Sequence, residues 1–132
     1  MANWQLMGPL DMLREGAMRE LRVGEHAVLL LRVGGQYHAY QGRCPHQGGP
    51  LARGTLKDGV VTCPWHGSQF NALTGECLAW VARLPGWERP IIKLFRPPRN
   101  LTVYPVREDQ GQVWIDIQAL PKQAEESRAR AE

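Results

Sequence analysis

Long apolar segments, clustered charge and abundant cysteine are all missing from this chain of 132 residues. Its most apolar run, Ala27–Val33, already contains Arg32 and is far shorter than the roughly 20 residues that a membrane-spanning helix needs. The chain does not open with a basic segment followed by an apolar stretch, so we expect no secretory signal peptide. These absences predict a protein without a membrane partner, in the cytoplasm.

Charge of either sign is modest and dispersed along the chain. The 16 Lys and Arg residues outnumber the 13 Asp and Glu residues and give a net charge of +3. Because nucleic-acid binding needs a concentrated basic surface, we expect no nucleic-acid partner. The 3 cysteines are too few for a disulfide framework, and metal ligation is their commoner use in a cytosolic chain.

Turn-forming residues are plentiful. The 14 Gly and 10 Pro residues separate short apolar runs, a pattern typical of an all-β antiparallel sandwich. Turns are expected at Gly34-Gly35, Asp58-Gly59, Thr74-Gly75 and Glu108–Gly111. The candidate strands are Trp4–Met7, Met18–Val23, His26–Val33, Gln36–Gln41, Val60–Cys63, Ser68–Asn71, Leu101–Val106 and Gln112–Ile117.

Two segments depart from the strand pattern. Pro85–Arg99 is rich in proline, so we expect an extended loop there. Residues 119–132 are rich in Ala, Glu and Arg and predict a C-terminal tail, either a marginal helix or a frayed end. The length suits one domain, which we expect over residues 1–118.

Four good metal donors are concentrated in two similar segments. The segment Cys44-Pro45-His46-Gln47-Gly48-Gly49 is similar to Cys63-Pro64-Trp65-His66-Gly67-Ser68, and each provides one thiolate and one imidazole. Two such loops can face each other across a common ligand. The candidate metal-ligating residues are therefore Cys44, His46, Cys63 and His66. A structural zinc site, which also accepts two cysteines and two histidines, is the alternative.

The spacing Cys-x-His followed by Cys-x-x-His, together with its flanking residues, resembles the Rieske family. The resemblance extends through Cys-Pro-His-Gln-Gly-Gly-Pro-Leu and Cys-Pro-Trp-His-Gly-Ser-Gln-Phe. It implies a Rieske-type antiparallel β-sandwich with a small cluster-binding subdomain made of two loops, at about 42–70. It also implies one [2Fe–2S] cluster, with one iron held by Cys44 and Cys63 and the other by His46 and His66.

Departures from the family pattern indicate which type of Rieske protein the chain resembles. High-potential relatives carry an additional cysteine in each loop, where this chain has Gly49 and Trp65, and a tyrosine where it has Phe70. We therefore expect a reduction potential near the low end of the range of Rieske centres. The Ser68 hydroxyl is a candidate donor to a bridging sulfide, so we expect Ser68→Ala to lower the potential.

Residues 79–99 resemble an insertion relative to the small ferredoxins of that family. They contain Trp87, Phe95 and a single acidic residue, Glu88. Their basic residues are Arg83, Arg89, Lys93, Arg96 and Arg99. Two interpretations stay open, a solvated loop that covers a sheet edge and a docking surface for an acidic electron-transfer partner. The docking interpretation combines Trp65 with the stretch around Arg89, Lys93 and Arg96.

The resemblance implies a low-potential Rieske-type ferredoxin, which is not itself an enzyme. Such a protein passes one electron at a time from a reductase to an acceptor such as a Rieske-type oxygenase. An oxygenase would need a mononuclear iron site as well, and only His26 and His38 remain. The alternatives are the small Rieske-like subunit of a nitrite reductase or another oxidoreductase complex, and a redox sensor.

The remaining cysteine, histidines and tryptophans have structural interpretations. Cys77 lies outside the ligand pattern and is expected to be a small buried residue. We expect His26 and His38 to be ordinary strand residues. The tryptophans expected to lie mostly in the core are Trp4, Trp80, Trp87 and Trp114.

Overall fold

The computed structural model describes residues 3–45, 48–65, 67–80, 87 and 98–117, and within these ranges the chain is strand and turn. One turn of 3₁₀ helix, η1, spans Leu51–Arg53, and no α-helix occurs in the described residues. The strands are β1 (Trp4–Pro9), β2 (Met18–Val23), β3 (His26–Val33), β4 (Gln36–Gln41), β5 (Thr55–Lys57), β6 (Val60–Thr62), β7 (Gln69–Asn71), β8 (Cys77–Ala79), β9 (Val103–Tyr104), β10 (Val106–Asp109) and β11 (Gln112–Asp116).

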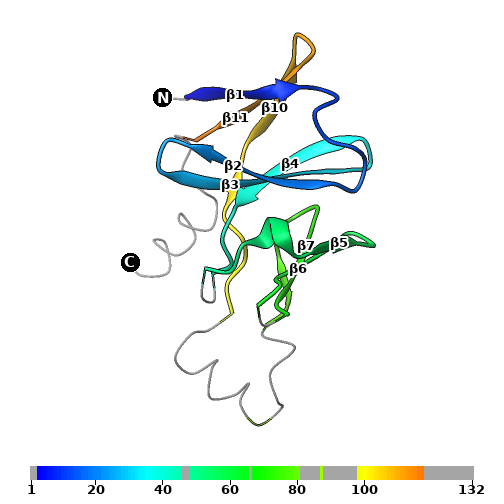
Figure 1. Cartoon of the computed structure of the whole chain (residues 1–132), viewed down its shortest axis with the longest axis vertical. Helices are drawn as coiled ribbons and strands as arrows, with labels where there is room; N and C mark the ends of the chain where they lie inside the picture. The colour runs from blue at the N-terminus through cyan, green and yellow to red at the C-terminus, as the bar shows by residue number, and fades with distance from the viewer. Residues whose placement is uncertain (1–2, 46–47, 66, 81–86, 88–97, 118–132) are drawn as a thin grey trace.

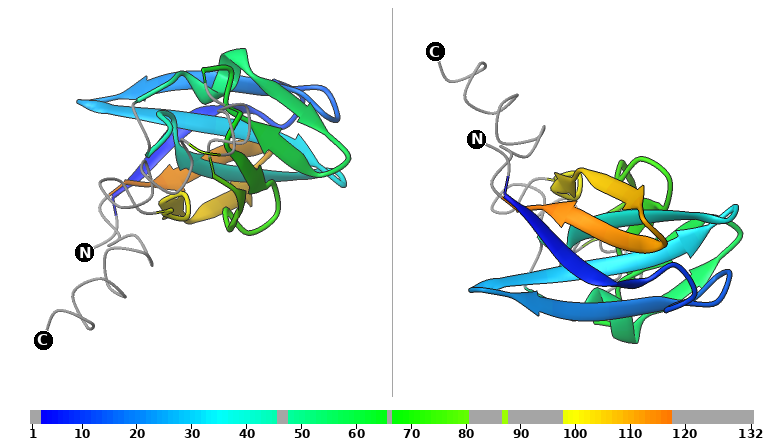
Figure 2. Two further views of the ribbon diagram at one scale, coloured as in Figure 1. Left: turned by 90° about the horizontal axis from the view of Figure 1, so that it is seen from below. Right: turned by 90° about the horizontal axis from the view of Figure 1, so that it is seen from above.

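The strands form three antiparallel sheets. The sheet orders are β1-β11-β10, β2-β3-β4-β9 and β5-β6-β7-β8. Figure 1 shows them one above another, with β2, β3 and β4 in the middle and the sheet of β5 to β7 below. The right panel of Figure 2 shows β1 and β11 in front of the middle sheet and at an angle to it. This arrangement confirms the predicted antiparallel sandwich.

The middle sheet is covered on both faces, which explains the unusually apolar sequence of β3. Val28 and Leu30 belong to one cluster of buried residues and Leu29 and Leu31 to the other. Successive side chains of a strand point to opposite faces, so one apolar run supplies two cores. We call the clusters the upper core (Leu13, Val23, Val28, Leu30, Tyr37, Ala39, Tyr104, Val113 and Ile115) and the lower core (Leu29, Leu31, Tyr40, Cys44, Leu51, Val61, Cys63, Phe70, Ala72, Trp80 and Leu101).

Strong apolar patterns predicted strand bounds well. The predicted strands Met18–Val23, His26–Val33 and Gln36–Gln41 match β2, β3 and β4 residue for residue. The predicted turn at Gly34-Gly35 is confirmed, with positive φ angles of 64° and 75° that glycine adopts without strain. β5 and β8 were not predicted. They are only three residues long and are defined by pairing with β6 and β7 rather than by an alternating pattern.

The strands after residue 101 differ from the prediction. The single strand predicted over Leu101–Val106 is wrong, because β9 and β10 belong to different sheets and Pro105 lies between them. Proline has no N–H to donate to a sheet, and the Pro105 carbonyl oxygen instead accepts from the Asp116 N–H at 3.1 Å. β10 continues to Asp109, so the last turn is shorter than predicted and centres on Gln110 and Gly111, with φ of 53° and 74°.

The predicted tryptophan positions hold only in part. Trp80 is buried in the lower core, whereas Trp87 is 69% exposed and the prediction of a core position for it is wrong. The predicted tail over 119–132 and most of 79–99 lie outside the described residues. In the described part of the chain no helix is long and apolar enough to cross a membrane.

Candidate metal centre

Main-chain hydrogen bonds join the described ends of the first candidate loop, residues 44–49. The Cys44 N–H donates to the Gly49 carbonyl oxygen at 2.8 Å, and the Gly48 N–H donates back to the Cys44 carbonyl oxygen at 2.8 Å. Gly48 has a φ of 78°, in the left-handed region that glycine adopts at little cost. The glycine is therefore what allows the chain to reverse within five residues of the cysteine.

The described residues of the second candidate loop, 63–68, make the same main-chain hydrogen bonds. The Cys63 N–H donates to the Ser68 carbonyl oxygen at 2.8 Å, and the Gly67 N–H donates to the Cys63 carbonyl oxygen at 3.1 Å. Gly67 has a φ of 77°. The two segments that are alike in sequence thus share the same pair of main-chain hydrogen bonds and a glycine of positive φ at the same place.

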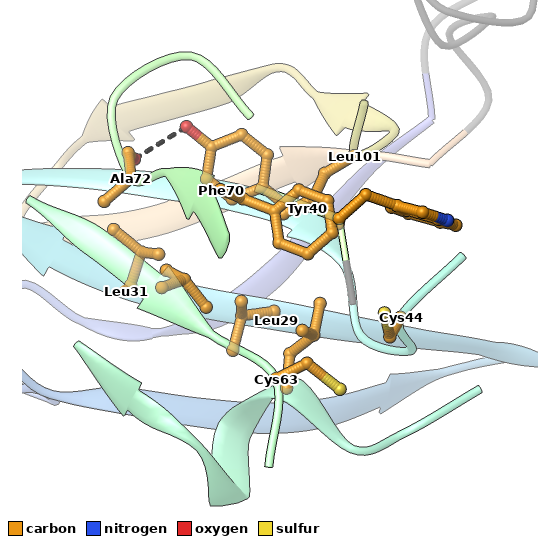
Figure 3. Packing of buried hydrophobic residues seen from close by; sticks show 11 residues of the cluster. Leu29, Leu31, Tyr40, Cys44, Cys63, Phe70, Ala72 and Leu101 are labelled. Carbon is orange, nitrogen blue, oxygen red and sulfur yellow. Dashed lines mark hydrogen bonds between the residues drawn. The ribbon is translucent and has the colours of Figure 1, made fainter. Parts of the chain in front are cut away.

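The two cysteines lie at one end of the lower core. Cys44 is 3% exposed and Cys63 is 2% exposed, and Figure 3 shows both at the same end of the cluster of apolar side chains. Neither forms a disulfide, and neither does Cys77. A Cβ atom built on Gly49 would lie 2.8 Å from the Cys63 Sγ. The sulfur of the second loop therefore lies against the backbone of the first loop, and the structure brings the two segments face to face.

The residues between and after the ligands occupy contrasting environments. Trp65 is 53% exposed, yet its ring would lie 3.1 Å from a Cβ on Gly49, so it covers the first loop while one side faces solvent. Ser68 is 1% exposed and Phe70 is fully buried. Cys77 is only partly buried and packs against the lower core, a less buried position than predicted.

Several predicted site residues lie outside the described residues. These are His46 and His66 of the ligand set and Arg89, Lys93 and Arg96 of the basic stretch. The other two histidines occupy strand positions as predicted, His26 in β3 and His38 in β4. The His38 ring is parallel to that of Tyr40, with 6.5 Å between centroids, and its burial lowers the imidazole pKa.

The described donors fit the thiolate half of a Rieske centre. Each loop contributes one buried cysteine, and thiolates are the soft ligands that select iron–sulfur clusters and zinc over harder metal ions. The missing side chain at Gly49 lets the Cys63 sulfur lie directly against the backbone of the first loop.

Tyr40 links this end of the molecule to the middle sheet. Its hydroxyl donates to the Ala72 carbonyl oxygen at 2.7 Å, as the dashed line in Figure 3 shows. A Cβ on Gly75 would lie 3.1 Å from the Tyr40 ring. Burial raises the pKa of the hydroxyl to about 12, so it stays protonated and donates at neutral pH.

Sequence reasoning missed the partners that hold the residue before Cys44. The Arg43 Nη2 lies 3.1 Å from the Glu20 Oε2. The Gln41 Nε2 donates to the Arg43 carbonyl oxygen at 2.8 Å, and the Gln41 Oε1 accepts from the Thr102 N–H at 2.7 Å. Glu20 and Thr102 are distant in sequence from the residues they contact, so no local pattern indicates these pairs.

Comparison with known proteins decides the family. The model of the Rieske [2Fe-2S] domain matches residues 3–96, which is well over half of the chain. The chain belongs to the Rieske [2Fe–2S] family. The Rieske domain is 34% identical to the ferredoxin component of the alkene monooxygenase system of Xanthobacter autotrophicus, over 119 residues that cover 88% of this chain and 83% of that relative.

A second relative is more similar over a shorter stretch. The Rieske domain is 48% identical to apoptosis-inducing factor 3 of Homo sapiens over 64 residues, which are 48% of this chain but only 11% of that protein. The chain therefore spans about a tenth of the length of that curated relative.

Among solved structures, the complex of reduced oxygenase and oxidized ferredoxin in carbazole 1,9a-dioxygenase contains a chain similar to the Rieske domain. The TM-score is 0.67 at 28% identity, covering 86% of this chain and 92% of the other. The comparisons confirm the predicted Rieske fold and its [2Fe–2S] cofactor.

Proposed function

We propose that this chain is a Rieske-type ferredoxin that accepts one electron from a reductase and delivers it to an acceptor enzyme such as a Rieske-type oxygenase. The observation that carries the proposal is the pair of matched loops, each with one buried cysteine, in a chain of the Rieske family. When bound, a [2Fe–2S] cluster supplies a site that takes up and releases a single electron. The chain itself performs no bond chemistry in this proposal.

The proposed ligands are Cys44 and Cys63 for one iron and His46 and His66 for the other. Burial of both cysteines at the end of the lower core keeps the thiolate side away from water. The N–H and the carbonyl oxygen of each cysteine are both engaged by the hydrogen bonds that close its loop. A ligand set presented by a folded backbone needs little reorganisation when the metal binds.

The names of the similar proteins support an oxygenase as the proposed electron acceptor. One relative is the ferredoxin component of an alkene monooxygenase system, and one similar solved chain lies in a complex of oxygenase and ferredoxin. An oxygenase partner and a separate reductase therefore suit a chain whose family match is to the Rieske domain alone.

We further propose that the partner docks beside Trp65 and the basic stretch around Arg89, Lys93 and Arg96. Trp65 combines a half-exposed indole with a position in the second loop, and aromatic residues with one free face are common anchors of protein interfaces. The basic stretch suits a partner with an acidic surface. We place this exchange in the cytoplasm and keep the division into a Rieske domain over 1–118 and a tail over 119–132.

The ligand assignment is tested by reconstituting the purified chain with iron and sulfide under anaerobic conditions. We expect a red-brown protein with two irons and two sulfides per chain and, after reduction, a rhombic electron paramagnetic resonance signal. Cys44→Ser, Cys63→Ser, His46→Ala and His66→Ala should each abolish that signal. The matched controls Cys77→Ser and His38→Ala should keep it. A colourless protein that binds zinc alone would refute the assignment.

The carrier role is tested separately with the reconstituted protein. In single-turnover experiments, reduction by a reductase should add one electron per chain, and reoxidation by a Rieske oxygenase should remove that electron. A protein that exchanges electrons only inside a stable complex purified with a larger subunit would instead support the oxidoreductase-subunit alternative.

A further inference from the structure

The two matched loops are anchored differently at their bases. The loop 63–68 is closed by β6 and β7, where Thr62 pairs with Gln69 in a four-stranded sheet. The loop 44–49 is closed by an isolated bridge between Arg43 and Pro50, and beside it the Leu51 N–H donates to the Gly42 carbonyl oxygen at 3.2 Å. The second loop is therefore closed by two strands of a sheet, whereas the first loop is closed by main-chain bonds outside any named strand pair, and a side chain adds to the bonds at its base.

The side chain that adds to these bonds is Gln41, the last residue of β4. Its Nε2 donates to the Arg43 carbonyl oxygen at 2.8 Å, and its Oε1 accepts from the Thr102 N–H at 2.7 Å. Its own N–H also donates to the Thr102 carbonyl oxygen at 2.9 Å. Gln41 thus connects the residue before Cys44 to the strand segment that leads into β9.

Only a primary amide satisfies both contacts at once. The Arg43 carbonyl oxygen requires a donor and the Thr102 N–H requires an acceptor, so the geometry allows one orientation of the amide. A carboxylate has acceptors alone and an aliphatic side chain has neither. The other side-chain contact to Arg43 is an ion pair with Glu20 in which the Arg43 side chain is 47% exposed, and exposed pairs contribute little.

We propose that Gln41 is a positioning residue for the metal centre, holding the Cys44 loop in register with Thr102. In this role it is not a ligand, and it acts through the backbone of Arg43. This inference rests on the proposed function, because it assumes that the Cys44 loop binds the cluster. It predicts that the amide of Gln41 sets how firmly the first loop retains its metal.

The test compares Gln41→Glu and Gln41→Leu with the wild-type protein and with Gln36→Leu, a control at the exposed start of the same strand. Three quantities are measured after reconstitution: the rate of iron release to a chelator, the midpoint potential and the g values of the reduced protein. We expect iron release to be about fivefold faster in both Gln41 variants, the factor that corresponds to one net hydrogen bond. The g values and potential should also shift, whereas Gln36→Leu should match the wild type.

Hydrogen–deuterium exchange provides a readout that does not depend on the cluster. In the metal-free protein the Cys44 and Gly48 amides should exchange faster in the Gln41 variants, while the Cys63 and Gly67 amides stay unchanged. If Gln41→Leu fails to fold, the nearly isosteric Gln41→Glu decides the outcome.

These experiments distinguish a failure of the Gln41 inference from a failure of the proposed function. Unchanged release, potential, g values and amide exchange in the Gln41 variants of a cluster-containing protein would overturn the inference and leave the proposed function intact. A wild-type protein that never acquires iron and sulfide would instead refute the proposed function.

Discussion

Gly54 illustrates how single residues shape the base of the candidate centre. It follows η1 with φ of −80°, which is not a conformation reserved for glycine. A Cβ built there would overlap the Thr62 carbonyl oxygen and come within 3.2 Å of the Pro64 Cδ. The two neighbours of Cys63 in the chain thus pack directly against a position that has no room for a side chain.

We therefore expect Gly54→Ala to lower the free energy of unfolding by about 1–3 kcal/mol, as is usual for overpacking. Urea denaturation of the reconstituted protein measures it, and the adjacent exposed Arg53→Ala is the control, with an expected change within about 0.5 kcal/mol. Equal stability of the Gly54→Ala and wild-type proteins would show that the backbone at Thr62 moves freely.

We expect substitution of Ser68 to change the reduction potential of the centre. It is 1% exposed and ends the second loop, where its carbonyl oxygen accepts from the Cys63 N–H. A hydroxyl donor to a sulfide stabilises the reduced state, which carries more negative charge. Ser68→Ala should lower the reduction potential by about 40 mV, the equivalent of one hydrogen bond of about 1 kcal/mol for a single electron.

Protein-film voltammetry measures the shift in potential. Ser68→Thr keeps the hydroxyl and serves as the control, with a potential close to that of the wild type. An unchanged or higher potential in Ser68→Ala would mean that the hydroxyl does not reach the cluster.

At the scale of elements, Tyr40 joins the sheet of β5 to β8 to the middle sheet. β4 carries it into the lower core, where its hydroxyl donates to Ala72 beyond the end of β7. Tyr40→Phe leaves the buried Ala72 carbonyl oxygen without this donor, and we expect a loss of about 1–3 kcal/mol in the free energy of unfolding. Tyr104→Phe is a suitable control, because the Tyr104 side chain makes no hydrogen bond within the described part of the chain.

The same hydroxyl predicts how stability depends on alkaline pH. Burial raises the Tyr40 pKa from 10.0 to about 12 in the folded state, so the unfolded chain loses this proton first as pH rises. The stabilisation is complete below about pH 10 and is lost as pH rises toward about 12. The difference in unfolding free energy between wild type and Tyr40→Phe should therefore shrink over this interval, and a constant difference would contradict the shifted pKa.

At the scale of the whole molecule, the net charge of +3 affects encounter with a partner rather than folding. If the basic stretch docks an acidic partner, the second-order rate of electron transfer should fall several-fold as ionic strength rises from about 0.05 M to about 0.5 M. Stopped-flow spectroscopy measures this rate. Replacing Arg89, Lys93 and Arg96 by alanine should remove most of the salt dependence.

Three arginines near the start of the chain provide a control of equal charge. Arg14, Arg19 and Arg22 are exposed residues in and before β2, and their replacement by alanine should leave most of the salt dependence in place. A rate that does not respond to salt would favour the interpretation of residues 79–99 as a solvated loop.

The sequence by itself determined the features that depend on neighbours along the chain. The proposed ligand pattern Cys44, His46, Cys63 and His66 is read from local spacing. The bounds of β2 to β4 and the Gly34-Gly35 turn follow from it as well, because side-chain alternation and turn conformations are local properties. Only the tertiary structure decided which distant groups meet. Gln41 reaches Thr102, Glu20 reaches Arg43 and the carboxylate of Glu15 accepts from both turn glycines, since such contacts arise from how the three sheets pack and leave no periodic trace in the sequence.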